Sequence, residues 1–314
     1  MASGPTFERV GRGLYVPAGR ARTPEQRAVD AAARLAGDGS HGHVTGWASL
    51  RWRGAAYFDG LDSAGQHEVP VQVTFPGHRN CRAWDGVVVS RRSIGPEEAE
   101  VVDGLPCTTV ARSLFDEVVR RDELWSGVQA VCMAAAAGLI STWLFARYAG
   151  ECHSRLGAPL VREVVSLSAD EFLSPREPWL WLVWQLVAGL EPPLVNHPVY
   201  TPDGSLLGVP DLFDPVLGLA AEYDGEIHRG RARHRRDVVR AERFRDHGVH
   251  LVQVVAGDTR REAASRILQV RGRAVAASGR AARWTVERPA WDPAPETLDS
   301  YLERTGQAER LAVW

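Results

Sequence analysis

The stretch from Ser174 to Ser278 alternates helix, strand and turn signals in a fixed order, and this order limits the folds open to the chain. A helix start at Ser174 leads into an apolar helical face, and three apolar strand patterns follow, separated by Thr-Pro-Asp-Gly and by a second short turn. An arginine-rich helix, a fourth strand and a last helix come next. The segments are 179–190, 195–200, 206–213, 219–224, 231–247, 249–255 and 258–278. This alternation predicts an α/β fold with an αβββαβα core.

The first half of the chain mixes short strands with helices. Thr23, Pro24 and Gln26 supply the cap, the first-turn proline and the capping-box partner of a helix that continues to Ala36. Strands are predicted at 9–16, 69–75 and 87–90, and helices at 109–116, 123–137 and 141–149. We therefore expect a mixed α/β region that ends in a helical block.

These patterns divide the chain into three parts. The mixed α/β region covers residues 1–165, the αβββαβα domain covers 166–279, and the proline-containing segment 280–314 is an appendage. Most tryptophans of the first part are expected in its core rather than as stacking platforms. They are Trp47, Trp52, Trp84, Trp125 and Trp143.

All 37 basic residues of the chain are arginine, and lysine is absent. This absence excludes a Walker-A loop, a kinase phosphate-pairing lysine and a Schiff-base enzyme. A GC-rich coding sequence explains it without any function. Because the net charge is −2, an affinity for nucleic acid has to come from a local patch.

The four cysteines are spaced too far apart for a zinc site and indicate buried thiols in a reducing compartment. They are Cys81, Cys107, Cys132 and Cys152. The N-terminus lacks the apolar segment of a signal peptide, and the apolar run 128–140 is too short to cross a bilayer. We expect a cytoplasmic protein without a membrane partner.

Three carboxylates stand inside the apolar strands 206–213 and 219–224. Glu222 and Asp224 are two residues apart and share a strand face. If the turn is 215–218, residue 214 pairs with 219 and Asp211 lies opposite Glu222. Opposed like charges destabilise a sheet, and a divalent cation, Mg²⁺ or Mn²⁺, held by Asp211 and Glu222 would compensate them.

Glu177 is a fourth candidate, one turn into the helix that precedes these strands. In the pattern Ser174-x-x-Glu177 the glutamate can simply accept the amide of the cap residue. It can also approach the carboxylates of the hairpin. The residues leave both interpretations open.

The residues Glu177, Asp211 and the string Glu222-Tyr-Asp224-Gly-Glu-Ile-His228, followed by Arg236-Asp237 and Arg240, resemble a known group. The group is that of bacterial domains related to very-short-patch-repair endonucleases, within the PD-(D/E)XK superfamily. The resemblance covers about residues 170–275 and implies a metal-dependent phosphodiesterase. It implies that Asp211 and Glu222 hold the metal, that Glu177 assists, and that Asp224 and His228 complete the site.

The chain departs from the broad superfamily at two places. Asp224 stands where the superfamily has a lysine that orients the attacking water, and His228 can take over that task because imidazole titrates near neutrality. Alternatively, His228 is a surface loop histidine. Trp181 occupies the position at which the subgroup tends to carry an arginine.

Eight arginines lie between His228 and His247, against three acids. Four of them follow helical spacing and share one face: Arg233, Arg236, Arg240 and Arg243. Such a face can bind DNA phosphates. It can equally be a solvated, ion-paired helix surface.

The strand 9–16, the helix after Thr23 and the motif Thr108-Thr-Val-Ala-Arg-Ser-Leu-Phe-Asp116 resemble the abortive-infection (AbiEi-like) type IV antitoxin family. In that family a winged-helix domain precedes a mixed α/β domain. Few residues precede Phe7, so a truncated remnant of the winged helix is expected. The resemblance implies DNA and a toxin or another protein as partners.

Two functions are consistent with these residues. The first is a metal-dependent DNA endonuclease acting in defence or repair, favoured by the opposed carboxylates. The second is a non-catalytic, antitoxin-like regulator that binds DNA or a protein partner, favoured by the missing lysine.

Overall fold

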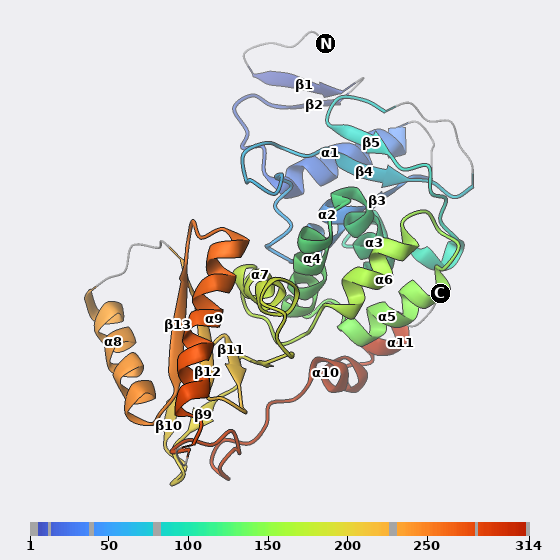
Figure 1. Ribbon diagram of the computed structural model, residues 1–314. Helices are drawn as coiled ribbons and strands as arrows, with labels where there is room; N and C mark the ends of the chain where they lie inside the picture. The colour runs from blue at the N-terminus through green and yellow to red at the C-terminus, as the bar shows by residue number, and fades with distance from the viewer. Residues whose placement is uncertain are drawn as a thin grey trace. The chain divides into compact units, whose positions relative to one another are not determined.

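The computed structural model describes residues 6–11, 14–37, 41–77, 83–225, 231–279 and 282–311 (Figure 1). The side chains of residues 10, 11, 36, 37 and 231–238 lie outside this description. The chain forms two compact units: the first contains the residues up to Asp170 and those from Thr297 onward, and the second runs from Glu171 to Glu296. Both units contain helices and strands, which confirms the predicted α/β class.

The first unit begins with a β-hairpin where the sequence predicts a single strand. β1 (Phe7–Gly11) pairs antiparallel with β2 (Leu14–Pro17). The prediction of one strand over 9–16 is therefore wrong. Gly11 ends β1, and glycine is favoured where a strand leads into a turn.

α1 (Pro24–Gly37) follows the hairpin and starts as predicted, since the Thr23 hydroxyl accepts the Gln26 amide at 3.2 Å. Its buried face packs against α2 (Gly46–Trp52) and against strands of the neighbouring sheet. The residues of that face are Ala28, Ala31, Ala32 and Leu35. Small side chains at helical spacing let α1 lie close to the sheet.

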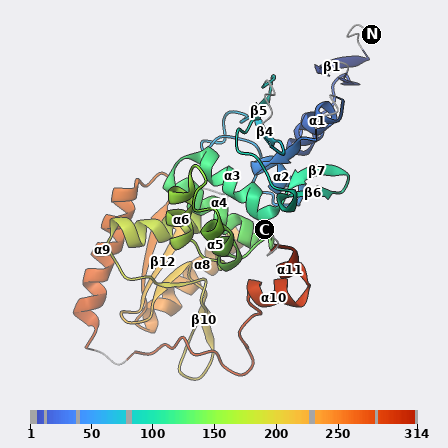
Figure 2. The ribbon, with the colours of Figure 1, turned by 90° about the vertical axis from the view of Figure 1, so that its right-hand side faces the viewer.

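A five-stranded sheet carries α1 and α2, in the order β5-β4-β3-β7-β6. The predicted strands correspond to β4 (Val71–Thr74) and β5 (Val87–Val89). The other three are β3 (His43–Thr45), β6 (Ala99–Val102) and β7 (Leu105–Thr108), and β6 and β7 form the outer hairpin visible in Figure 2. These three strands are too short for a clear alternation, so periodicity does not predict them.

The helical block contains α3 (Val110–Arg121), α4 (Leu124–Ala136), α5 (Thr142–Glu151) and α6 (Ala158–Ser166). Thr109, Glu123 and Ser141 cap the first three helices through backbone amides three residues on. α10 (Leu298–Arg304) and α11 (Gln307–Leu311) belong to the same unit. The block predicted for 109–149 is confirmed, and α6 extends it.

Side chains of the tryptophans divide between core and surface. Trp47 is buried, as expected, whereas Trp143 is 52% exposed and contradicts the expectation of a core position. Arg147 lies over the Trp143 ring at 5.0 Å, so this surface indole is partly covered by a cation. The described cysteines Cys107, Cys132 and Cys152 are buried free thiols, and Cys81 lies outside the described residues. None of the described helices is long and apolar enough to cross a membrane.

The second unit is built on a four-stranded sheet in the order β13-β12-β11-β8. Its strands are β8 (Leu194–Val195), β11 (Leu212–Asp214), β12 (Leu219–Asp224) and β13 (His250–Val255). β12 and β13 are parallel, and the other neighbours are antiparallel. β9 (Val199–Tyr200) and β10 (Leu206–Gly208) form a separate hairpin.

Two strands of the predicted core are each broken in two. The strand predicted for 195–200 is interrupted at Asn196, whose φ of 44° is left-handed. The strand predicted for 206–213 is interrupted at Pro210, which has no amide hydrogen for a ladder. The predicted turn at 201–204 does join β9 to β10.

Helices cover both faces of the sheet. α8 (Arg231–Asp246) lies on one face, and α7 (Arg176–Leu182) and α9 (Arg260–Ala277) on the other (Figure 1). α7 continues as a π-helical turn, Val183–Val187, so the helix predicted for 179–190 is not a regular α-helix. Under α8 the core contains Phe213, Ala220 and Phe244, with Trp284 against it.

Candidate active site

The hairpin of β11 and β12 has the register predicted from its turn. Asp214 pairs with Leu219, and Phe213 pairs with Ala220. The Asp214 carboxylate accepts the amides of Val216 and Leu217, at 2.7 and 3.2 Å, which fixes the turn. The ladder ends at the pair Leu212 and Ala221, so the predicted partners Asp211 and Glu222 are the next residue on each side, just beyond the last printed pair.

Glu222 lies on the face of the sheet that α8 covers. Phe213 and Ala220 point into the core under α8, and side chains two residues along a strand point the same way. The contact of Glu222 with α8 agrees with this: Arg240 donates from Nη2 to Glu222 Oε2 at 2.9 Å. Glu222 therefore lies beyond Ala220 on the same face of β12, where the apolar core gives way to a charged pair.

The ion pair between Arg240 and Glu222 is partly shielded from water. The Glu222 side chain is 10% exposed and that of Arg240 is 34% exposed. The stem of Arg240 packs on Gly208, where a Cβ would lie 3.1 Å from Arg240 Cδ and 2.9 Å from Phe244. Glycine at this position of β10 therefore leaves the space that the arginine needs.

Glu177 on α7 is buried and accepts two hydrogen bonds at Oε2. One comes from the Leu173 amide at 2.8 Å and the other from the Asn196 side chain at 2.7 Å. The predicted capping box with Ser174 is therefore wrong in detail, because Glu177 accepts the amide of the preceding residue instead. Asn196 also donates to the Glu171 carbonyl at 2.9 Å, so the left-handed residue links α7 to the sheet.

The pKa of Asp211 is raised to about 6. Burial is the largest cause, and the charge of Glu177 adds to it, while the Tyr223 amide, which donates to Asp211 Oδ2 at 2.7 Å, and the charge of Arg240 lower it. Desolvation and the charge of Glu177 therefore raise the pKa of Asp211, and Glu222 is not among the causes. Glu177, Asp211 and Arg240 therefore act on one another.

Tyr223 points to the opposite face of β12, as the alternation predicts. Its ring lies 5.9 Å from Trp179 of α7, edge to face, and Arg176 lies over it at 5.6 Å. Asp224 is half-buried at the end of β12, and its carbonyl accepts the Ala256 amide at 2.9 Å. His228, predicted as the base, lies outside the described residues.

The four arginines predicted to bind DNA fall into three situations. Arg233 and Arg236 lie on α8, but their side chains are outside the described part of the structure. Arg240 turns inward to Glu222, and Arg243 is exposed. Trp181 is at the position where the subgroup that the sequence resembles tends to have arginine. Its ring packs edge to face on Phe172 with ring centroids 5.8 Å apart.

The carboxylates can be tested against a divalent cation. Within the described ranges no group of three or more histidine, cysteine, aspartate or glutamate side chains is arranged to hold a metal. Glu177 already serves two protein donors, so a three-carboxylate site is not formed. Mg²⁺, however, is commonly held by only one or two carboxylates with water and phosphate oxygens. Asp211 and Glu222 fit such a two-carboxylate site by residue type and register.

Two residues of this site escape sequence reasoning. Asn196 looks like an ordinary strand residue, and only its neighbour Pro198 hints at a break. Gly208 looks like a weak point of a strand, although an isolated strand glycine does indicate a close approach of another group. Asn196 contacts Glu177 and Gly208 contacts Arg240, and both contacts join residues distant in sequence.

No protein-family model, curated protein or solved structure matches the chain.

Proposed function

We propose that the second unit is a metal-dependent endonuclease domain that hydrolyses DNA phosphodiester bonds, in defence or repair. The observation that carries the proposal is that Asp211 and Glu222 directly follow the last pair of the β11–β12 ladder, with Glu222 bound to Arg240 of α8. Two opposed carboxylates favour a cation between them. Glu177 adds a further negative charge close to Asp211.

In this proposal each residue has a separate task. Asp211 and Glu222 would hold Mg²⁺ or Mn²⁺, which would supply Lewis-acid polarisation of a phosphoryl oxygen and a water molecule of lowered pKa. Glu177, oriented by Asn196, maintains the negative charge of the site. Asp224 completes the site from the same face of β12, and His228 accepts the proton of the attacking water.

Arginines of α8 supply the affinity for DNA in the proposal. Arg233, Arg236, Arg240 and Arg243 follow one helical face, and guanidinium groups bind phosphates in a bidentate manner. Arg240 lies closest to the carboxylates, with a third of its side chain exposed beside Glu222. Binding through phosphates predicts little dependence on sequence and a steep loss of affinity with salt.

A cleavage assay tests the proposal. The purified chain is incubated with supercoiled and with linear DNA in Mg²⁺, in Mn²⁺ and in EDTA, beside the variants Asp211→Asn and Glu191→Gln. Glu191 is an exposed carboxylate of the same unit and serves as the matched control. We expect cleavage with a divalent cation by the wild type and by Glu191→Gln, and none by Asp211→Asn.

A second function, a non-catalytic regulator that binds DNA or a protein such as a toxin, is favoured by the ion pair of Arg240 with Glu222. An internal cation already neutralises one of the two proposed metal ligands. The chain also has no lysine that could orient a water. DNA binding without cleavage in any divalent cation would support this function against the first.

A further inference from the structure

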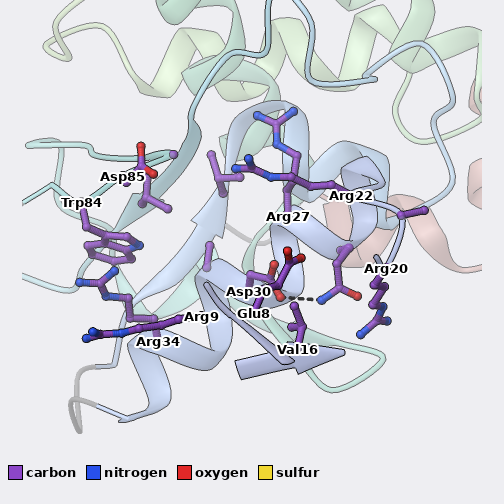
Figure 3. Close-up of a pocket in the computed structure, with 16 residues that line it drawn as sticks. Glu8, Arg9, Val16, Arg20, Arg22, Arg27, Asp30, Arg34, Trp84 and Asp85 are labelled. Carbon is purple, nitrogen blue, oxygen red and sulfur yellow. Dashed lines mark hydrogen bonds between the residues drawn. The ribbon is translucent and has the colours of Figure 1, made fainter. Parts of the chain in front are cut away.

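The first unit contains a pocket of about 340 Å³ whose lining is rich in arginine. β1, β2, the segment before α1, α1 itself and the turn into β5 contribute to its walls (Figure 3). Its guanidinium groups belong to Arg9, Arg20, Arg22, Arg27 and Arg34. Three carboxylates also line it, so the pocket has an excess of positive charge although the chain is net negative. A cavity of this size accommodates a small molecule.

Arg27 belongs to the framework of the pocket. The residue is buried, and its guanidinium donates to the carbonyls of Gly60, at 3.1 Å, and Val69. Its guanidinium carbon also lies 4.7 Å from the centre of the Trp47 ring. These contacts fix α1 against the segment 60–69, so the wall exists before any ligand enters.

Arg34 is stacked on Trp84, with its guanidinium carbon 4.8 Å from the ring centre. A guanidinium that lies over an aromatic face can still direct the N–H donors of its own plane to a carboxylate or phosphate in a bidentate manner. Trp84 thus orients Arg34 along the pocket. Both side chains stand at one end of the pocket in the view of Figure 3.

Arg20 stands at the other end of the pocket in the same view. Its residue is exposed, and its side chain has no hydrogen bond or ion pair with any residue that the structure describes. Arg22, by contrast, lies 3.8 Å from Glu68. Arg20 therefore adds positive charge at that end of the pocket without a partner among the residues that the structure describes.

Two of the three carboxylates, Asp30 and Glu8, lie in the middle of the pocket in Figure 3, and the third, Asp85, lies beside Trp84. Asp30 on α1 accepts from Gln26 Nε2 at 2.5 Å, and Glu8 of β1 is drawn close to it in Figure 3. Carboxylates repel a continuous row of phosphates but accept hydrogen bonds from hydroxyl groups. The lining therefore suits a ligand with phosphate at one end and hydroxyl groups beside it.

We propose that this pocket binds a phosphorylated pentose, with Arg34 at one end available to its phosphate and with Glu8 and Asp30, between the two ends, accepting from its hydroxyl groups. The same chemical group occurs in a free sugar phosphate, in a mononucleotide and at the 5′ end of a nucleic-acid strand. The proposal is independent of the carboxylate site in the second unit.

Calorimetric titration of the full chain tests it with ribose 5-phosphate, AMP, a 5′-phosphorylated single strand and inorganic phosphate. We expect ribose 5-phosphate to bind more tightly than inorganic phosphate. Loss of a charge-assisted bidentate contact weakens binding by about tenfold or more, so Arg34→Gln should do so. Arg162→Gln, an exposed arginine of α6 in the same unit, is the matched control and should bind as the wild type does.

The arms of the experiment separate the sources. Tighter binding of AMP or of the 5′-phosphorylated strand than of ribose 5-phosphate would identify the larger ligand, within the proposal. The melting temperature of Arg34→Gln, compared with that of the wild type, shows whether the variant is folded when its binding is measured. Absence of binding at millimolar probe, an equal effect of Arg162→Gln, or equal affinity for a strand without 5′-phosphate would overturn the proposal.

Discussion

Buried charges are balanced in the first unit and unbalanced in the second. In the first unit Arg112, fully buried, donates to Asp116 at 3.0 Å and to Glu98 at 2.9 Å. Arg155 and Tyr148 donate to the other Glu98 oxygen, at 2.5 and 2.6 Å. In the second unit Asp211 lies close to a second carboxylate and has a raised pKa.

The pKa values show what this difference means. Burial opposes the ionisation of Glu98, but the hydrogen bond from Arg155 and the charge of Arg112 outweigh it, and the pKa of Glu98 is lowered. At Asp211 burial outweighs the Tyr223 amide and Arg240, and the pKa is raised. Buried carboxylates that are paired with arginines stabilise the fold. A buried carboxylate with a raised pKa, such as Asp211, instead marks a site where an external cation can bind.

Breaking the compensated network should have the largest effect. Arg112→Gln leaves Glu98 and Asp116 buried with one cation fewer each, which costs about 3–5 kcal/mol of unfolding free energy. Urea unfolding at pH 7 measures it, with Arg162→Gln as the control near zero. A loss below about 1 kcal/mol would mean that the network is not a stabilising unit.

Removing the charge of Glu98 should have a smaller effect that depends on pH. Glu98→Gln should cost about 2–3 kcal/mol at pH 7, because hydrogen bonds to a charged group are lost. Since the folded-state pKa of Glu98 lies below its usual 4.5, this stability is present above about pH 4.5 and is lost as the pH falls through the folded pKa. Urea unfolding between pH 7 and pH 3 checks that the difference in unfolding free energy between the wild type and Glu98→Gln becomes smaller as the pH falls.

Removing the charge of Asp211 should act in the opposite direction and be the smallest of the three. Asp211→Asn keeps an acceptor for the Tyr223 amide and should stabilise the metal-free protein by about 1–2 kcal/mol at pH 8. The folded pKa of about 6 exceeds the usual 3.8, so the wild type loses stability as the pH rises between these values. The gain should therefore grow from pH 4 to 6 and then stay constant. A destabilised variant at pH 8 would show that the carboxylate is compensated.

Local chemistry made part of this molecule predictable from its sequence. The register of β11 and β12 follows from the turn at 215–218, and α1 follows from the cap at Thr23. Strand faces follow from alternation, which predicts Glu222 and Tyr223 on opposite faces of β12. Their contacts with Arg240 and Trp179 agree with this.

Contacts between distant residues were not predictable in the same way. Arg240 meets Glu222 because α8 packs over the sheet on Gly208, and Asn196 meets Glu177 because the chain breaks in a left-handed turn. The arginines of the N-terminal pocket come from segments that show no common motif. Such groupings depend on packing, which periodicity and turn signals do not encode.

Thermal unfolding with and without divalent cations tests the central claim that Asp211 and Glu222 form a cation site. The wild type is melted in EDTA and in millimolar Mg²⁺ or Mn²⁺, beside Asp211→Asn and Glu191→Gln. A cation that binds the folded state raises the melting temperature. We predict a rise for the wild type and for Glu191→Gln and none for Asp211→Asn. An unchanged wild type in both cations, or an equal rise in Asp211→Asn, would contradict the claim.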